Sequence, residues 1–528
     1  MAFHPRLTRL GGIHPAGVRT QAWVSPVLAL AALLVGWKVA QWIAAGDTSL
    51  LLFTAIGTAV LAITVVILNN WRIGCYGLIA WLLFEDIIRK YMGNNMTIYF
   101  AKDVLAATVY FSFWTSLQRK RESLFKPPFL VPFGFFFFLG LVQCFNPNSP
   151  SLLYGLLGFK LYFYYVPLMF IGYSLIRGDE DLRRFFLFSM GLAIVISVLG
   201  IAQAIIGPSF LNPATLAPDI RDLSTLYRVA PITGAILYRP TSVFVSDGRF
   251  ASYLLLAWIL GLGAAGFILL RRARGQLVIY LGTAVAIVAA VFSGGRGMFA
   301  QAILTAIVLA AGFLWGAPWR QRLSHRMIKA IWRTGVIAAA AIVLAVALFP
   351  EQVGARWDFY SETMNPESQA SEVQGRMEAY PVSEFLKAFD YPNWPLGYGI
   401  GTASLGVQYV SRWLGQRPPN LGVESGFGTL VLEYGIAGPI LWLIWTASLL
   451  FTGAKAALRV KQTAYFPVAC AIWWFAFCLL VMMTYGTMVM YQNFVYNAYF
   501  WLLVGILFRL PVLASSSTTV YSVAADPQ

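Results

Sequence analysis

Charged residues are scarce in this chain. Asp, Glu, Lys and Arg make up 11% of the 528 residues, whereas 59% are hydrophobic. A soluble domain carries about 25% charged residues, so this chain cannot give itself a water-facing surface. The composition therefore excludes a separate soluble enzyme domain and predicts an all-α polytopic membrane protein.

Cysteine and histidine are also rare. The four cysteines lie within apolar stretches and form no CxxC pair, which predicts neither a disulfide framework nor a metal site. The three histidines, His4, His14 and His325, fall in segments expected on the cytoplasmic side. A general base on the other side would then have to be a carboxylate, because Tyr and Lys are mostly protonated at neutral pH.

Long apolar runs fill most of the chain. At about 20 apolar residues per crossing, they predict about fourteen transmembrane helices. The expected spans are 22–45, 49–69, 74–90, 97–117, 128–145, 159–176, 185–206, 249–270, 276–293, 298–316, 335–349, 427–453, 466–484 and 491–510.

The spans divide the chain into five parts. We expect an N-terminal segment over 1–21, the first eleven spans over 22–349, a long loop over 350–426, the last three spans over 427–510, and a tail over 511–528 that is disordered from Leu513. The loop 350–426 is expected to hold one short amphipathic helix along the membrane surface, from Arg376 to Tyr391.

The basic residues encode the orientation. The formal charge of +16 comes largely from Lys and Arg in short loops between apolar runs, so nucleic acid is not implied. If the N-terminus is cytoplasmic, every inside loop contains a basic residue, whereas the loop 350–426 is mainly acidic. Both termini are therefore expected in the cytoplasm and this loop outside.

Arginines at the outer ends of the spans are the first candidates for chemistry. Arg296 lies in the short turn Ser293–Gly297, Arg239 and Arg249 precede the eighth span, and Arg376 opens the proposed surface helix. Guanidinium groups bind phosphate oxygens bidentately and keep their charge at any accessible pH. Converging arginines could hold a pyrophosphate without a metal, although each could also bind lipid phosphate or the acidic loop.

Glu424 is the candidate base, at the point where the long loop re-enters the membrane. It could instead cap the twelfth span, or do both. The rival carboxylates are Asp247, Asp358, Glu378 and Glu384.

Other charges near the outer boundary are expected to pair structurally. Glu85 with Arg89 is an i,i+4 pair, and Lys102 adjoins Asp103. Lys160 has no acidic neighbour in the sequence and is a second candidate for phosphate contact.

Four segments in order resemble the O-antigen ligase and polymerase superfamily of bacterial membrane glycosyltransferases. They are Arg239-Pro-Thr-Ser-Val-Phe, Phe292-Ser-Gly-Gly-Arg296-Gly, Gly375-Arg376 followed by Asn393-Trp-Pro-Leu-Gly397-Tyr-Gly399-Ile-Gly401, and Glu424 to Gly438. The likeness covers about residues 239 to 440.

The resemblance implies a GT-C-type fold in the bacterial inner membrane and a metal-independent inverting transfer without a cofactor. The partners it implies are a polyprenyl-pyrophosphate-linked glycan donor and a glycan acceptor at the periplasmic face, with a chain-length regulator as a further partner. The ligase branch has a His-Asn pair where this chain has Glu424-Ser425, which favours a repeat-unit polymerase of O-antigen or exopolysaccharide.

Two alternatives stay open. One is a ligase of the same superfamily, acting on lipid A core or on protein. The other is a transporter of lipid-linked oligosaccharides, which should place charges and broken helices near the membrane midplane and often shows repeat symmetry. The notable charges of this chain cluster at the outer boundary instead.

Overall fold

The computed structural model describes residues 48–93, 96–213, 226–271, 273–318, 380–523 and, with interruptions, 329–371. The chain separates into two units, Met1–Asn70 and Trp71–Gln528. Of the first unit the structure describes one helix, α2 (Thr48–Asn69), which matches the predicted span 49–69. The predicted span 22–45 lies outside the described residues.

The described residues are mostly helical, as predicted, and the helices are those of a membrane protein. Within the described part of the chain, seven helical stretches are long and apolar enough to cross a bilayer. They are Leu152–Leu175, Asp179–Ile206, Asp247–Arg271, Arg296–Gly316, Ala437–Arg459, Phe466–Gly486 and Phe494–Ser515.

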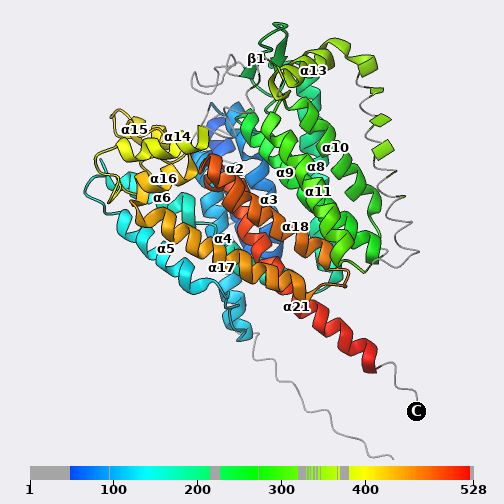
Figure 1. Cartoon of the computed structure of the whole chain (residues 1–528). Helices are drawn as coiled ribbons and strands as arrows, with labels where there is room; N and C mark the ends of the chain where they lie inside the picture. The colour runs from blue at the N-terminus through cyan, green and yellow to red at the C-terminus, as the bar shows by residue number, and fades with distance from the viewer. Residues whose placement is uncertain are drawn as a thin grey trace, which may run out of the picture. The chain divides into compact units, whose positions relative to one another are not determined.

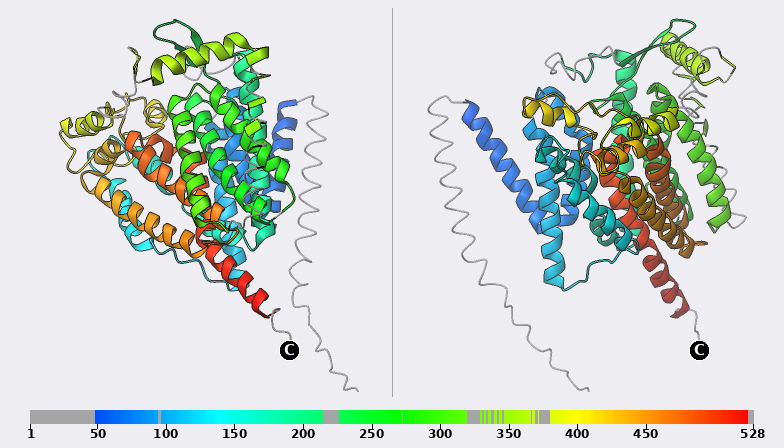
Figure 2. Two further views of the ribbon diagram at one scale, coloured as in Figure 1. Left: turned by 45° about the vertical axis from the view of Figure 1, so that its right-hand side comes forward. Right: turned by 60° about the vertical axis from the view of Figure 1, so that its left-hand side comes forward.

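The second unit is a helical bundle (Figures 1 and 2). Before the β-hairpin, the structure gives the helices α3 (Trp71–Tyr91), α4 (Met96–Lys120), α5 (Leu130–Gln143), α6 (Leu152–Phe163), α7 (Leu168–Leu175) and α8 (Asp179–Ile206). After it come α9 (Asp247–Arg271), α10 (Gln276–Phe292) and α11 (Arg296–Gly316). The chain ends with α17 (Ala437–Arg459), α18 (Phe466–Phe477), the π-helix η4 (Cys478–Met483), α19 (Thr484–Gly486), α20 (Val489–Gln492) and α21 (Phe494–Val523).

Small residues let these helices approach closely. α7 packs along α21, with glycines at the contact that leave no room for a side chain. A Cβ added to Gly172 would lie 2.1 Å from the carbonyl oxygen of Leu502, and a Cβ added to Gly505 would lie 2.0 Å from the carbonyl oxygen of Met169. Van der Waals contact between small residues is a main source of helix association in membranes. This contact fixes the C-terminal helix against the middle of the bundle.

Two segments outside the bundle contain more structure than the sequence predicted. Residues 226–238 include an antiparallel hairpin, β1 (Tyr227–Val229) and β2 (Ile236–Tyr238), with Tyr227 opposite Tyr238. The loop 350–426 contains α13 (Pro350–Met364), which packs on β2, and a separate group formed by α14 (Tyr380–Leu386), η3 (Lys387–Asp390) and α15 (Val407–Trp413) (Figure 1). The expected short helix is met in part by α14 and η3, whereas α13 and α15 were not predicted, and the hairpin is an exception to an all-α fold.

The expected amphipathic helix is only partly described. Its first part, including Arg376, lies outside the described residues. The described helix α14 begins at Tyr380, so Pro381 falls in its first turn. The N–H groups of a first turn have no acceptor within the helix, so a proline there breaks no helical hydrogen bond.

Three predicted boundaries differ from the structure. The span 427–453 is two helices, α16 (Gly426–Tyr434) and α17, because the chain turns at Gly435 with φ of 72°. The span 159–176 is the pair α6 and α7. The tail expected to be disordered from Leu513 continues α21 to Val523. The span 335–349 is only partly described.

Candidate functional site

Charged side chains gather at one end of the bundle. They lie in the last two turns of α3, the second turn of α4, the third turn of α6, the segment before α9, the first turn of α9 and the first residue of α11. We call this set the charged rim. Its members are Glu85, Asp86, Arg89, Lys90, Lys102, Asp103, Lys160, Arg239, Asp247, Arg249 and Arg296.

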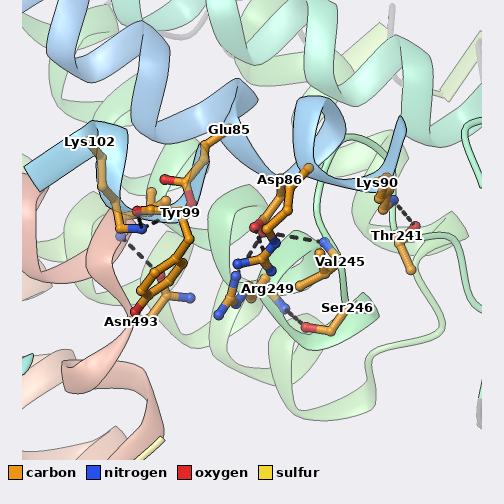
Figure 3. Close-up of polar contacts among 12 residues, drawn as sticks. Glu85, Asp86, Lys90, Tyr99, Lys102, Thr241, Val245, Ser246, Arg249 and Asn493 are labelled. Carbon is orange, nitrogen blue, oxygen red and sulfur yellow. Dashed lines mark hydrogen bonds and ion pairs between the residues drawn. The ribbon is translucent and has the colours of Figure 1, made fainter. Parts of the chain in front are cut away.

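Ion pairs of the rim join different helices, as between Glu85 and Lys102 and between Asp86 and Arg249 (Figure 3). Lys102 Nζ lies 2.9 Å from Glu85 Oε1, and Lys160 Nζ lies 2.5 Å from Asp103 Oδ2. Asp86 binds Arg249 at 2.8 Å and Arg89 at 3.1 Å. These charges pair structurally, as expected, but with other partners. Glu85 binds Lys102 of α4, Asp103 binds Lys160 of α6, and Arg89 binds Asp86 of its own helix.

Lys90 fixes the segment that carries the first candidate arginines. Its buried Nζ donates to Thr241 Oγ1 at 2.9 Å and to the carbonyl oxygen of Ser242 at 3.1 Å. Gln203 of α8 accepts hydrogen bonds from the backbone N–H groups of the same two residues. Two helices thus hold residues 241–242, where Ser242 adopts a positive φ of 51°.

Arg239 and Arg296 come to the same place from different elements. Arg239 is 18% exposed, forms an ion pair with Asp247 and passes beside Gly294, whose added Cβ would lie 3.0 Å from Arg239 Cγ. Gly294 has φ of 68°, and α11 begins two residues later at Arg296, as the predicted tight turn requires. The Arg296 guanidinium lies 4.9 Å from the centre of the Phe359 ring.

A further buried arginine joins this group from α13. Arg356 donates to the carbonyl oxygens of Phe292 and Tyr238, both at 3.2 Å, and burial lowers its pKa to about 10. Burial likewise lowers the pKa of Arg239, an effect that Asp247 opposes and that Arg228 and Arg296 reinforce. These shifts mean that the site holds its positive charge at a desolvation cost that a bound anion would relieve.

The candidate base lies in a different group. Glu424 is exposed, and its backbone N–H donates to Glu384 Oε2 at 3.0 Å. That bond and Lys387 hold the pKa of Glu384 below its ordinary value. The N-cap of α16 is Ser425, whose hydroxyl accepts from the N–H of Gly428 at 3.2 Å, so the side chain that caps this helix is not that of Glu424.

The segment 484–494 connects the two groups. Gly426 packs on it so closely that an added Cβ would lie 2.0 Å from the carbonyl oxygen of Thr484. At the other end of the segment, the Phe494 ring lies 5.1 Å from the Arg249 guanidinium. Glu424, two residues before Gly426, and Arg249 thus lie near opposite ends of this segment.

Glu433 is a structural carboxylate. It is fully buried and accepts hydrogen bonds from Tyr162 at 2.8 Å, from Ser404 at 2.6 Å and from the backbone N–H of Ala403 at 3.1 Å. These bonds fasten the glycine-rich segment 393–405 to α6 and α16. The position of Glu433 away from the exposed Glu424 agrees with the sequence interpretation that the two do not share one site.

The structure brings together Arg239 and Arg296 of the predicted set. It pairs Arg249 with Asp86 and Lys160 with Asp103, and Arg376 lies outside the described residues. Sequence reasoning missed Lys90 and Arg356 as parts of the arginine group. Lys90 was passed over with the other charges of α3, and Arg356 lies in a helix that the sequence did not predict. No protein-family model, no curated protein and no solved structure matches the chain.

Proposed function

We propose that this chain is a membrane glycosyltransferase that polymerises polyprenyl-pyrophosphate-linked oligosaccharide repeat units. The observation that carries the proposal is the convergence of Arg239 and Arg296 beside the turn at Gly294. Arg356 adds positive charge to the same region, and Lys90 donates hydrogen bonds to the segment that follows Arg239. The cations of the rim outnumber its carboxylates, which favours an anionic ligand.

In the free protein, two of the arginines form ion pairs with carboxylates. Asp247 pairs with Arg239 and Asp86 pairs with Arg249. A diphosphate offers more acceptor oxygens than a carboxylate and suits a planar guanidinium fork. In the proposed mechanism the donor diphosphate takes the place of Asp247, and Arg239 and Arg296 bind its oxygens.

The proposed reaction is a displacement at the anomeric carbon of the donor sugar. The bond from this carbon to the diphosphate oxygen breaks, and its electron pair leaves with the diphosphate, whose charge the arginines stabilise. The acceptor hydroxyl forms the new glycosidic bond with inversion, and its proton passes to a carboxylate, for which Glu424 is our candidate. The acceptor hydroxyl belongs to a second lipid-linked chain, which thereby grows.

We place this reaction at the periplasmic face of the bacterial inner membrane, in a GT-C-type bundle with both termini in the cytoplasm. A chain-length regulator is a proposed additional partner. A ligase of the same superfamily is the alternative enzyme. The described charges favour an enzyme over a lipid-linked oligosaccharide transporter, because they lie toward the ends of α3, α4, α9 and α11 and leave the middle turns of these helices apolar.

The test is direct. Purified protein is incubated with lipid-linked repeat units, and longer lipid-linked chains are followed. Arg239→Ala and Arg296→Ala should each lower turnover about 10- to 100-fold, since a charge-assisted phosphate contact contributes about 1.5–3 kcal/mol. Arg296→Lys keeps the charge but loses the fork, so it should also be impaired.

Arg417→Ala provides the matched control. Arg417 is an exposed arginine of the loop 350–426, outside the charged rim. Its loss removes the same charge and should leave turnover within about twofold of wild type, as expected for a surface position. Wild-type activity in both Arg239→Ala and Arg296→Ala proteins that insert normally would reject the proposal, whereas new chains ending on lipid A core would replace the polymerase with the ligase.

A further inference from the structure

A second charged site lies at the opposite end of the bundle from the charged rim. A cavity of about 590 Å³ opens between the last turn of α4, the connection that follows it, the end of α7 and the middle of α21. Such a volume is typical of pockets for small molecules or lipid headgroups. We call it the basic pocket, after the cations Lys120, Arg177 and Arg509 in its wall.

The wall of this pocket carries more positive than negative charge. Glu122 is the acidic residue among those that line it. Among the described residues, no salt bridge engages Lys120, Arg177 or Arg509. Arg509 is half-buried, and its Nε donates to the carbonyl oxygen of Ile176 at 3.1 Å, which holds the guanidinium in place while its terminal nitrogens have no partner in the described part of the chain.

The wall is also aromatic. The Phe125 and Tyr173 rings stack with centroids 4.2 Å apart and an interplanar angle of 7°, and the Arg509 guanidinium lies 5.2 Å from the centre of the Tyr173 ring. The connection that carries Phe125 leaves α4 through Arg121, which has φ of 54°. A residue other than glycine adopts this conformation only when its surroundings fix it. The pocket is therefore built by a shaped connection rather than by a row of surface side chains.

The position of the basic pocket along the helices indicates the kind of ligand. Lys120 is the last residue of α4, and Arg177 lies between the ends of α7 and α8, so the cations sit where apolar helices meet the polar zone. Basic pockets at this level bind the phosphate groups of anionic lipids. The adjoining aromatic rings suit an apolar part of the same molecule, which free phosphate lacks.

We propose that the basic pocket binds the phosphate headgroup of an anionic phospholipid from the leaflet on its own side of the membrane. This lipid differs from the glycan donor, since its site lies at the other end of the helices. Lys120, Arg177 and Arg509 bind the phosphate oxygens, and Phe125 and Tyr173 contact the glycerol and upper acyl region. The lipid fastens α21 to the connection between α4 and α5.

The experiment measures binding rather than turnover, so its result is independent of the proposed transferase. Delipidated full-length protein in detergent is titrated with phosphatidylglycerol, phosphatidylcholine and inorganic phosphate, and lipid-bound species are counted by native mass spectrometry. Phosphatidylglycerol should bind about tenfold or more tightly than phosphatidylcholine, because charge-assisted contacts favour the anion.

Two double variants remove the same charge from the same end of the bundle. Lys120→Gln with Arg177→Gln alters exposed side chains of the pocket, whereas Lys455→Gln with Arg459→Gln alters the exposed end of α17 outside it. The first pair should weaken phosphatidylglycerol binding about tenfold, and the second by less than about twofold. Equal losses in both pairs would overturn the proposal in favour of general electrostatic attraction. Inorganic phosphate that binds as tightly as the lipid would overturn the lipid assignment.

Discussion

Arg239 and Asp247 form an ion pair between the segment before α9 and the first residue of that helix. In the proposed mechanism the donor diphosphate displaces this carboxylate. Asp247→Asn should therefore tighten donor binding several-fold, because the competing charge is gone while Arg239 remains. The dissociation constant of a labelled lipid-linked repeat unit provides the measurement. Asp358→Asn, which removes a carboxylate of α13 outside the charged rim, is the control and should leave donor binding unchanged. Weaker binding in Asp247→Asn would show that the pair positions Arg239 instead.

Glu424 and Ser425 allow the role of base to be separated from the role of helix cap. Glu424→Gln keeps the size of the side chain but cannot accept a proton, so single-turnover rates should fall about 10²- to 10⁴-fold with donor binding intact. Ser425→Ala removes the N-cap of α16 and should lower stability by about 1 kcal/mol while the rate is largely kept. Unchanged chemistry in Glu424→Gln would reject it as the base.

The orientation of the bundle can be tested by labelling. In a background without Cys75, Cys144, Cys470 and Cys478, Trp413→Cys and Ser123→Cys place one exposed thiol at each end. An impermeant maleimide should label position 413 in intact spheroplasts and position 123 only after the membrane is opened. The reverse pattern would move the arginine group to the cytoplasmic side and overturn the proposed donor side.

Gly401 and Gly406 form a matched pair of glycines. Both have left-handed backbones, with φ of 90° and 93°. A Cβ on Gly401 would lie 2.0 Å from the carbonyl oxygen of Tyr154, whereas the nearest atom to one on Gly406 is 3.7 Å away. Gly406→Ala should cost about 1–2 kcal/mol through backbone strain alone. Gly401→Ala should cost about 1–3 kcal/mol more, measured as a lower thermal midpoint in detergent. Equal shifts would show that segment 393–405 does not need its close contact with α6.

Glu362 ties α13 to the turn of the hairpin. Burial raises the pKa of its carboxyl, but hydrogen bonds from the N–H groups of Ile232 and Thr233, at 2.6 and 3.0 Å, outweigh this and leave the pKa below the ordinary 4.5. The stabilisation is therefore complete above pH 4.5 and is lost as the pH falls through the lower folded-state pKa.

Hydrogen exchange of the backbone amides in residues 230–235 measures the contact between α13 and the turn of the hairpin. Protection, corrected for the intrinsic rate, should hold from pH 7 to about 5 and decrease below 4.5. Glu362→Gln should show lower protection than wild type from pH 7 to about 5 and approach wild type at lower pH. Glu367→Gln, an exposed neighbour outside the contact, should behave as wild type. Protection in Glu362→Gln that equals wild type at pH 7 would exclude this role.

The sequence predicted the helices best in the long apolar runs, where the need for backbone hydrogen bonds in lipid decides the conformation. The long apolar runs over 185–206, 249–270 and 298–316 have to satisfy their backbone hydrogen bonds internally in lipid, so each becomes a helix with nearly the predicted ends. The turn before Arg296 was predictable for a similar reason, since Gly294 supplies the left-handed conformation that a short connection requires.

Only the tertiary structure decided how the charges pair and which residues share a site. Lys160 binds Asp103 and Lys102 binds Glu85 because the helices that carry them are neighbours. The spacing of residues along one helix does not show which helices are neighbours. Arg356 reaches Tyr238 only because α13 folds back onto the hairpin, a contact between segments 118 residues apart. The sequence determined by itself that apolar helices fill a membrane and that arginines lie near one boundary. Packing between distant helices determined which of those arginines meet, because the free energy of a buried charge depends on partners that only the folded chain brings close.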